Sequence, residues 1–481
     1  MRRALVTVLA LVALTRVVPA RGAIDRRELA KRWVEDAIAR GTVDLARGVE
    51  LRESDDELSA PSRPYGFVAR RAPIERGEAY ARVAWNETIH PSRYAATDGG
   101  LGALLASMRS EYGEDEKTAL LVCLIYERFE KGEHSAFDEY FRMMPEEFDT
   151  PAHWSETTAR ELRGSDVYER DIVEEFKLLD KVWKTLRLRV FEPHGDVFKG
   201  EAAKSLYALQ WAWSVVHSRA MRVSGKTGLA IVPVIEMVRE CDDTANDEDL
   251  RSNETLSEDE GDGLESSFAV YDPHTDEVVV YAKSDYEPGA ELCERHGGRN
   301  LAESVQHLGY LPVLSEKSKR NCVLLVLEPE RQYIEKVRRA GFTVPWRVCV
   351  PLSATERSLD LLAAYANLAS GADVEIGNDG IPRNVSRDAA RELLAERLKR
   401  FPTTKEEDSA ALSSMRNSIK SYLESIEKDK LELLERARYE EKIRQLRRSM
   451  IVVELRSREK RILASLIDGM SPLSTVKHDE L

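Results

Sequence analysis

Residues 126–155 read YERFEKGEHSAFDEYFRMMPEEFDTPAHWS, and the order of residue types in this stretch decides the fold. The stretch opens on an acidic, helix-like segment and turns at Lys131-Gly132. It continues as a spaced aromatic run and closes on Phe-Asp-Thr-Pro followed by Trp154. The residues that define this order are Glu127, Lys131, Gly132, Ser135, Tyr140, Pro145, Phe148, Asp149, Thr150, Pro151 and Trp154.

This order resembles the Rubisco large-subunit methyltransferase branch of SET-domain proteins, to which an actin-histidine methyltransferase also belongs. The resemblance runs from about Leu29 to Ile467. It implies an α+β fold, in which a SET domain of small β-sheets with a pseudoknot carries a helical insert. A mostly α-helical substrate-binding domain follows. In this family the quoted stretch is scaffold, so it predicts the fold before it predicts an activity.

The length of 481 residues exceeds what one core usually supports, so two or more domains are expected. Within the SET domain the helical insert covers about 100–213 and an acidic loop covers 240–265. The predicted parts are a signal peptide at 1–22, the SET domain at 23–315, the substrate-binding domain at 316–470 and a tail at 471–481.

The net charge of -14 argues against a nucleic-acid binder, which would display a basic face. Twelve acidic residues against one basic residue, Arg251, lie between Glu240 and Glu265. Like charges at this density favour a solvated, disordered loop. Weak calcium binding is the alternative, although neither the spacing nor the turn glycine of a calcium loop is present.

The two ends of the chain predict its compartment. Arg2 and Arg3 precede the apolar run 4–14, and small residues follow near Ala20, as in a secretory signal peptide. The run is too short to cross a bilayer, so no membrane span is expected. Residues 477–481, KHDEL, read as an ER-retention signal. We therefore expect a protein of the endoplasmic reticulum lumen whose substrate or partner is a protein of the secretory pathway.

Three sequons agree with this location, at Asn86, Asn253 and Asn384, and predict a glycoprotein. The five cysteines show no zinc spacing. Cys123 lies in an apolar helical run and is expected to be a buried thiol.

The spacing of the histidines in the sequence does not match that of a metal site. His217, His296 and His307 are not brought together by helical or hairpin intervals, so no metal is predicted.

Local patterns predict the elements around the quoted stretch. Residues 26–39 have helical periodicity, and residues 65–85 alternate around Arg76-Gly77 as a strand, turn and strand would. A helical block is expected from Leu101 to about Trp213, and strands at 228–238, 267–292, 321–330 and 346–353. Helix formers dominate 408–468, with apolar stripes at Leu412, Met415, Ile419, Leu423 and Ile426 and at Ile443, Leu446, Met450 and Val453.

The resemblance also implies a cofactor, S-adenosylmethionine, and landmark residues that hold it. Gly66 and Phe67 match the second half of the family's Gly-x-Gly turn, whose first glycine is replaced by Pro64. Arg219, at the end of an aromatic helix, matches an arginine beside the cofactor and the substrate channel. Glu236 replaces an aspartate on the substrate side.

The remaining landmarks depart from the family pattern. Arg239 and Glu240 occupy the cofactor-binding positions of an Asn-His pair, and His296 replaces the tyrosine of an earlier Tyr-Gly. Leu308 occupies the position of the catalytic tyrosine, so no catalytic residue is intact. Tyr310 is a substitute only if the segment is a strand, where a two-residue offset keeps the same face.

Two functions therefore remain open. The chain is a SAM-dependent protein-lysine or protein-histidine N-methyltransferase, or it is a catalytically inactive SET-fold protein that binds a protein partner in the endoplasmic reticulum.

Overall fold

The computed structural model describes residues 26–53, 65–70, 72–95, 99–112, 116–240, 269–294, 299–377, 380, 382–383, 385–428 and 433–470. Several sequence predictions lie outside the described residues. They are the signal peptide, the tail, the acidic loop beyond Glu240, Pro64, His296 and the sequons at Asn253 and Asn384.

The helices are α2 (Arg26–Ala39), α3 (Gly99–Tyr112), α4 (Glu116–Ile125), α5 (Asp138–Met143), α6 (Glu156–Arg160), α7 (Val173–Leu186), α8 (Leu206–Arg219), α9 (Leu301–Glu303), α10 (Ile334–Arg339), α11 (Glu356–Ala369), α12 (Asp388–Lys399), α13 (Lys405–Lys428) and α14 (Leu433–Gly469). None of these helices in the described part of the chain is both long and apolar enough to cross a membrane.

The strands are short and form small sheets. They are β1 (Val43–Leu45), β2 (Val49–Glu53), β3 (Tyr65–Ala69), β4 (Ala79–Ala84), β5 (Met221–Arg222), β6 (Leu229–Ala230), β7 (Arg239–Glu240), β8 (Ala269–Asp272), β9 (Glu277–Tyr281), β10 (Glu291–Glu294), β11 (Cys322–Leu327), β12 (Trp346–Pro351), β13 (Glu375–Ile376) and β14 (Pro382–Arg383).

Two four-stranded sheets have the orders β1-β4-β9-β8 and β2-β3-β10-β7. The strand, turn and strand predicted at residues 65–85 are present, but β3 and β4 belong to different sheets and do not pair as a hairpin. β3 pairs with β2 and β10, and β4 pairs with β1 and β9. Gly77 does turn the chain, with a φ of 86°. A local alternation indicates a strand but does not name its partner.

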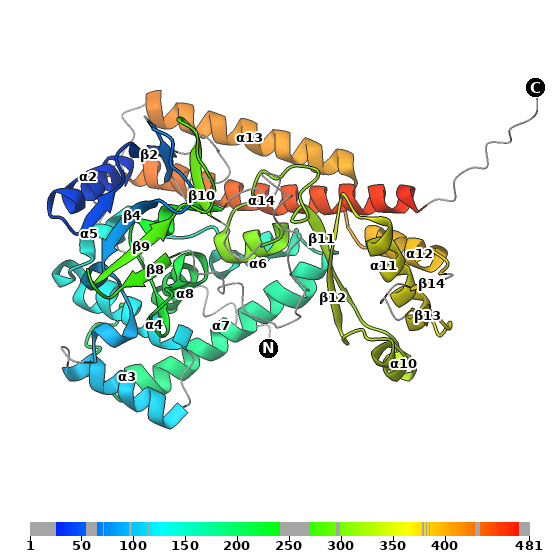
Figure 1. The fold of residues 1–481 in the computed structure, drawn as a ribbon, viewed down its shortest axis with the longest axis horizontal. Helices are drawn as coiled ribbons and strands as arrows, with labels where there is room; N and C mark the ends of the chain where they lie inside the picture. The colour runs from blue at the N-terminus through cyan, green and yellow to red at the C-terminus, as the bar shows by residue number, and fades with distance from the viewer. Residues whose placement is uncertain are drawn as a thin grey trace, which may run out of the picture.

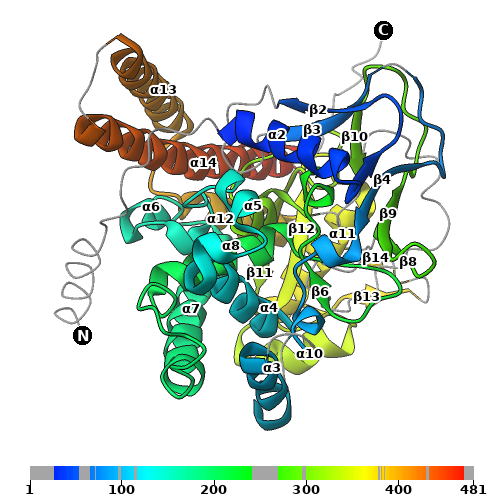
Figure 2. The same cartoon turned by 90° about the vertical axis from the view of Figure 1, so that its left-hand side faces the viewer.

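The helical block predicted between Leu101 and Trp213 is formed by α3 to α8 and ends at Arg219. Its centre is α4, in which every residue from Ala119 to Ile125 is buried. Cys123 lies in this run as a buried thiol, as predicted. The helices α4, α7 and α8 all lie below α14 in both views (Figures 1 and 2).

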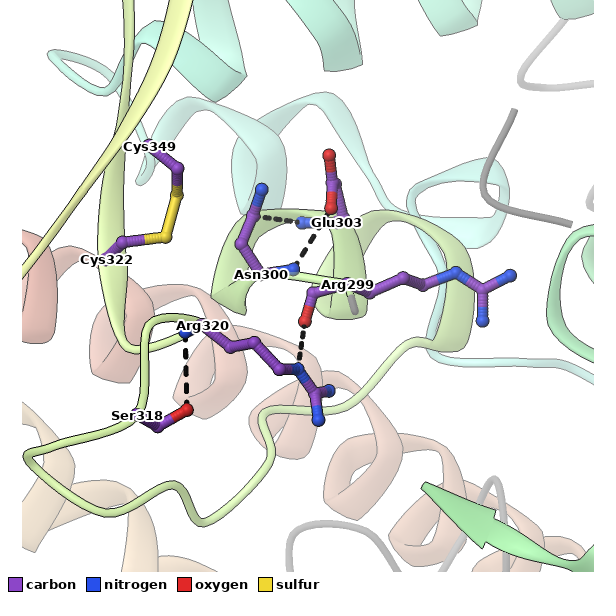
Figure 3. Close-up of a disulfide and its surroundings, with 7 residues drawn as sticks. All are labelled: Arg299, Asn300, Glu303, Ser318, Arg320, Cys322 and Cys349. Atoms are coloured by element: carbon purple, nitrogen blue, oxygen red, sulfur yellow. Dashed lines mark hydrogen bonds between the residues drawn. A yellow bond between two sulfur atoms is a disulfide. The ribbon is translucent and has the colours of Figure 1, made fainter. Parts of the chain in front are cut away.

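The strands expected after residue 320 form one hairpin. β11 and β12 pair antiparallel from Cys322 opposite Pro351 to Leu327 opposite Trp346. A disulfide joins Cys322 to Cys349 across it, with Cα atoms 5.5 Å apart (Figure 3). The hairpin packs against α14, and Val323, Leu325 and Val350 enter a core shared with α11 and α12.

The helix formers at 408–468 build the long helices α13 and α14, which pack on each other. Leu412, Met415 and Ile419 of the first predicted stripe meet Met450 and Val453 of the second. Figure 1 shows α14 running from the small sheets at one end to α11 and α12 at the other. This helix therefore connects the part of the molecule that contains the small sheets with the part that contains α11 and α12.

Candidate functional site

The first part of the stretch 126–155 is anchored on one buried carboxylate. Glu127 is 2% exposed. It accepts hydrogen bonds from the Tyr94 hydroxyl (3.0 Å), the Lys131 ammonium (3.1 Å) and the Ser135 hydroxyl. Gly132 follows with a φ of 54° and a ψ of -122°, a backbone conformation that suits glycine. These residues hold the turn, which agrees with the scaffold role that the resemblance implied.

The second part of the stretch is held by α14. The Arg448 guanidinium lies 3.1 Å from the Asp149 carboxylate and donates to the carbonyls of Phe148 (2.9 Å) and His153 (3.0 Å). The Trp154 indole N–H donates to the Asp149 carbonyl at 2.8 Å. Burial raises the pKa of Asp149, and Arg448 opposes this shift. The Phe-Asp-Thr-Pro motif is therefore the joint between the helical insert and the C-terminal helix.

Four of the five residues predicted to touch the cofactor share one sheet, and the fifth, Arg219, ends α8. Gly66 and Phe67 lie in β3, and Phe67 pairs with Leu292 of the neighbouring strand β10. On its other side β10 runs parallel to β7, which carries Arg239 and Glu240. In this sheet one strand, β10, therefore separates Gly66 and Phe67 from Arg239 and Glu240.

Arg219 and Glu236 form a buried ion pair next to this sheet. Their side chains are 6% and 1% exposed. The Tyr140 hydroxyl donates to the second Glu236 oxygen at 3.2 Å, and the Phe148 ring faces the Arg219 guanidinium at 5.6 Å. Burial raises the pKa of the Tyr140 hydroxyl well above its ordinary value, and the Glu236 charge adds to this shift. Tyr140 therefore stays a neutral donor to the ion pair.

Sequence reasoning predicted Arg219 and Glu236 at the site and missed Tyr140 and Phe148 as their partners. Both aromatic residues belong to the motif 126–155, and Tyr140 lies 96 residues before Glu236. Their places in the motif were the only signal in the sequence.

A strained turn positions Glu236. Val234 has a φ of 72° and a ψ of -54°, and the Ile235 N–H donates to the Pro233 carbonyl at 2.9 Å. This is a γ-turn with positive φ, which is costly for a β-branched residue. The strand expected at 228–238 consequently stops at Ala230, and a 3-10 turn, η8 (Ile235–Met237), carries Glu236. Strain of this kind at a buried residue is typical of a functional position.

The segment that carries Leu308 is helical. Asn300 and Glu303 form a capping box that starts α9 (Figure 3). The chain continues as a π-helical turn, η10 (Ser304–Leu308), and leaves it at Gly309 with a φ of 70°. Because this is not a strand, the two-residue rule by which Tyr310 would share the face of Leu308 does not apply.

Gly309 packs closely on the motif. A Cβ atom there would lie 2.7 Å from the backbone of Asp149 and Thr150. Leu308 is 1% exposed. The position predicted to correspond to a catalytic tyrosine therefore lies next to the segment whose Phe148 ring faces Arg219, and it carries an apolar side chain.

The residues at these positions do not fit the reaction that the implied cofactor serves. S-adenosylmethionine supplies an activated methyl group, and the protein must align and deprotonate the acceptor. Leu308 cannot donate or accept a hydrogen bond. Arg219 and Glu236 already neutralise each other in a buried pair. We therefore derive no methyl-transfer step through these residues.

Comparisons with known proteins identify partial relatives. The chain is 24% identical over 191 residues to the Rubisco large-subunit N-methyltransferase of Pisum sativum, covering 40% of this chain and 36% of that protein. It is 24% identical over 193 residues to the fructose-bisphosphate aldolase-lysine N-methyltransferase of Arabidopsis thaliana, covering 40% and 37%. The chain thus matches little more than a third of the length of these curated relatives. No protein-family model matches it.

Solved structures match over a larger part of the chain. The SET domain of LSMT bound to lysine and AdoHcy aligns with a TM-score of 0.60 at 17% identity, covering 92% of this chain and 91% of that one. Rubisco LSMT bound to AdoMet aligns with a TM-score of 0.58 at the same identity and coverage. The predicted α+β SET fold, with its helical C-terminal region, is confirmed.

Proposed function

We propose that this chain, which has the fold of the LSMT SET domain, binds a protein partner in the lumen of the endoplasmic reticulum and does not transfer a methyl group by its relatives' tyrosine route. The buried Leu308 carries this proposal. A leucine there can neither orient an amine nor take part in proton transfer. The buried contacts of Glu127 and Asp149 in the motif 126–155 support retention of the scaffold for binding.

The buried charges support the same function. Arg219 and Glu236 neutralise each other's charge, and the Tyr140 hydroxyl donates to the second oxygen of Glu236. If Arg219 left this pair to bind a ligand, Glu236 would remain as a buried charge without a partner, which is energetically costly. Both residues therefore serve as internal support for the sheet and the motif.

A second candidate function is SAM-dependent N-methylation of protein lysine or histidine. The comparisons favour it, since both curated relatives are named as N-methyltransferases, one of them for lysine, and the two solved structures described above hold AdoHcy and AdoMet. In that case the sheet β2-β3-β10-β7, whose strands carry Gly66, Phe67, Arg239 and Glu240, would hold the cofactor.

Calorimetric unfolding with and without SAM separates the two functions. A ligand present at a hundredfold its Kd that binds only the folded state stabilises it by about 2.7 kcal/mol. We expect the melting temperature of the mature protein to stay unchanged in millimolar SAM. The pea methyltransferase, treated in parallel, is the positive control. A SAM-dependent rise for this chain contradicts the first proposal and supports the second.

The lumenal location is also a proposal, and the cysteines support it. Cys322 and Cys349 form a disulfide, and Cys293 is disulfide-bonded as well. Disulfides persist mainly in oxidising compartments. The sequon residue Asn86 is exposed, in a turn where an attached glycan has room.

This location predicts a specific chemical state of the protein isolated from its own cells. Alkylation before reduction should leave Cys322 and Cys349 unmodified, and peptide mass spectrometry should find both modified only after reduction. The peptide that contains Asn86 should carry a glycan removable by peptide N-glycosidase F. Thiols at both cysteines together with a bare Asn86 would contradict a lumenal location.

A further inference from the structure

A hollow of 520 Å³ opens between α7, α8 and the turn η10. Trp213 and His217, four residues apart on α8, line it together with Gln306 and His307 of η10. Arg219 follows His217 by two residues and therefore leaves α8 on roughly the opposite side. The hollow is thus separate from the Arg219 and Glu236 pair. Its volume is that of a small-ligand site.

A buried carboxyl group, Glu175 of α7, lies at this hollow. It accepts hydrogen bonds from the Trp213 indole N–H (3.0 Å) and the Gln306 amide (3.2 Å) and is 8% exposed. Both donors are neutral, and among the described residues no lysine, arginine or histidine forms an ion pair with it. Burial raises the pKa of Glu175 to about 7, and Asp171 adds to the shift. A buried carboxylate of this kind lacks a counter-charge.

Most other charged groups around the hollow are already paired, and Lys181 lies on the exposed rim, where water screens its charge. The pairs are Arg170 with Glu328 (3.0 Å), Lys177 with Glu174 (2.5 Å) and Arg347 with Asp171 (2.9 Å). Within the hollow, the Glu175 carboxyl group is therefore the one that lacks a cation among the described residues.

The wall of the hollow is a stack of three flat rings. The Trp213 and His217 rings lie 4.5 Å apart at 28°, and the His217 and His307 rings lie 5.4 Å apart at 12°. Burial, with His307, Lys117 and Arg299 nearby, lowers the pKa of His217 well below its ordinary value, so this imidazole is neutral. Imidazoles stacked face to face do not converge on a metal, and the described residues contain no cluster that could hold one.

We propose that this hollow receives a basic side chain, lysine or arginine, of the protein partner. The ammonium or guanidinium group would supply the counter-charge of Glu175 and lie against the aromatic stack, which attracts cations. The statement that this basic side chain belongs to a protein partner rests on the proposed function, whereas cation binding by the hollow does not. Small amines test the hollow itself, so cation binding and partner binding can fail separately.

Fluorine NMR of the intact protein labelled with 5-fluorotryptophan tests this site. The chain has seven tryptophans, and the Trp213 signal is assigned by its loss in Trp213→Phe. N-acetyl-arginine amide and N-acetyl-lysine amide should shift this signal in a saturable way, and the uncharged N-acetyl-norleucine amide should not. Glu175→Gln should weaken binding about tenfold or more, because it removes the charge and keeps the shape. Glu174→Gln, on the same rim, should leave it unchanged.

The pH dependence of binding to the unmodified protein gives a second measurement. Affinity for the arginine probe should rise about tenfold from pH 6 to pH 8 as the Glu175 carboxyl ionises. Glu175→Gln should flatten this rise. An equal shift with the norleucine probe, full binding by Glu175→Gln, or no saturable shift at about 50 mM probe would overturn the proposal.

Discussion

Replacing Arg448 with methionine should lower the free energy of unfolding by about 3–5 kcal/mol. Arg448 is the buried cation of Asp149, and their side chains are 6% and 5% exposed. It also donates to the carbonyls of Phe148 and His153. Methionine fills much of the same volume but leaves the carboxylate buried without a counter-charge. Urea unfolding at neutral pH, followed by circular dichroism, measures the loss.

The matched control is Arg438→Met on the same helix, because Arg438 is exposed. Its effect should stay within about 0.5 kcal/mol. The penalty of Arg448→Met should also shrink at lower pH, since burial already raises the pKa of Asp149 and a protonated Asp149 needs no cation. If both variants unfold at the same urea concentration, α14 is not what holds the motif.

The sequence predicted those elements whose signal is local. The helix at 26–39, the insert helices, the hairpin strands β11 and β12, and the helices α13 and α14 all follow from periodicity and residue type. The strand partners did not follow, because β3 pairs with β10 from the far side of the insert, as Val68 opposite Glu291 shows. The alternation of residue types shows which face of a strand is buried. The neighbouring strand is determined by contacts between residues that lie far apart in the sequence.

The site was predictable in part for the same reason. The residue types at Arg219, Glu236 and Leu308 could be compared with the family pattern one position at a time. The contacts of Tyr140 with Glu236, of Phe148 with Arg219 and of Arg448 with Asp149 join distant parts of the chain. The γ-turn at Val234 was hidden because valine normally favours a strand. Glu175 was hidden because a charged residue on a helix is normally solvated.

Replacing Arg219 with methionine should cost about 3–5 kcal/mol of unfolding free energy, because Glu236 would remain as a buried charge without a partner. The double variant Arg219→Met with Glu236→Gln should recover most of this loss. The neutral amide needs no cation, and its oxygen can still accept the Tyr140 hydrogen bond. Glu236→Gln alone completes a double-mutant cycle, measured by urea unfolding.

The cycle also distinguishes the two proposed functions. If Arg219 and Glu236 only stabilise the fold, the coupling energy between them is large. SAM then changes the urea midpoint of none of the four proteins in the cycle. If Arg219 instead serves a bound ligand, Arg219→Met costs less than about 1 kcal/mol, since an arginine that is not part of the packed core contributes little to stability. A small loss would therefore count against the buried ion pair and against the inactive-scaffold proposal that rests on it, and it would return Arg219 to the substrate channel.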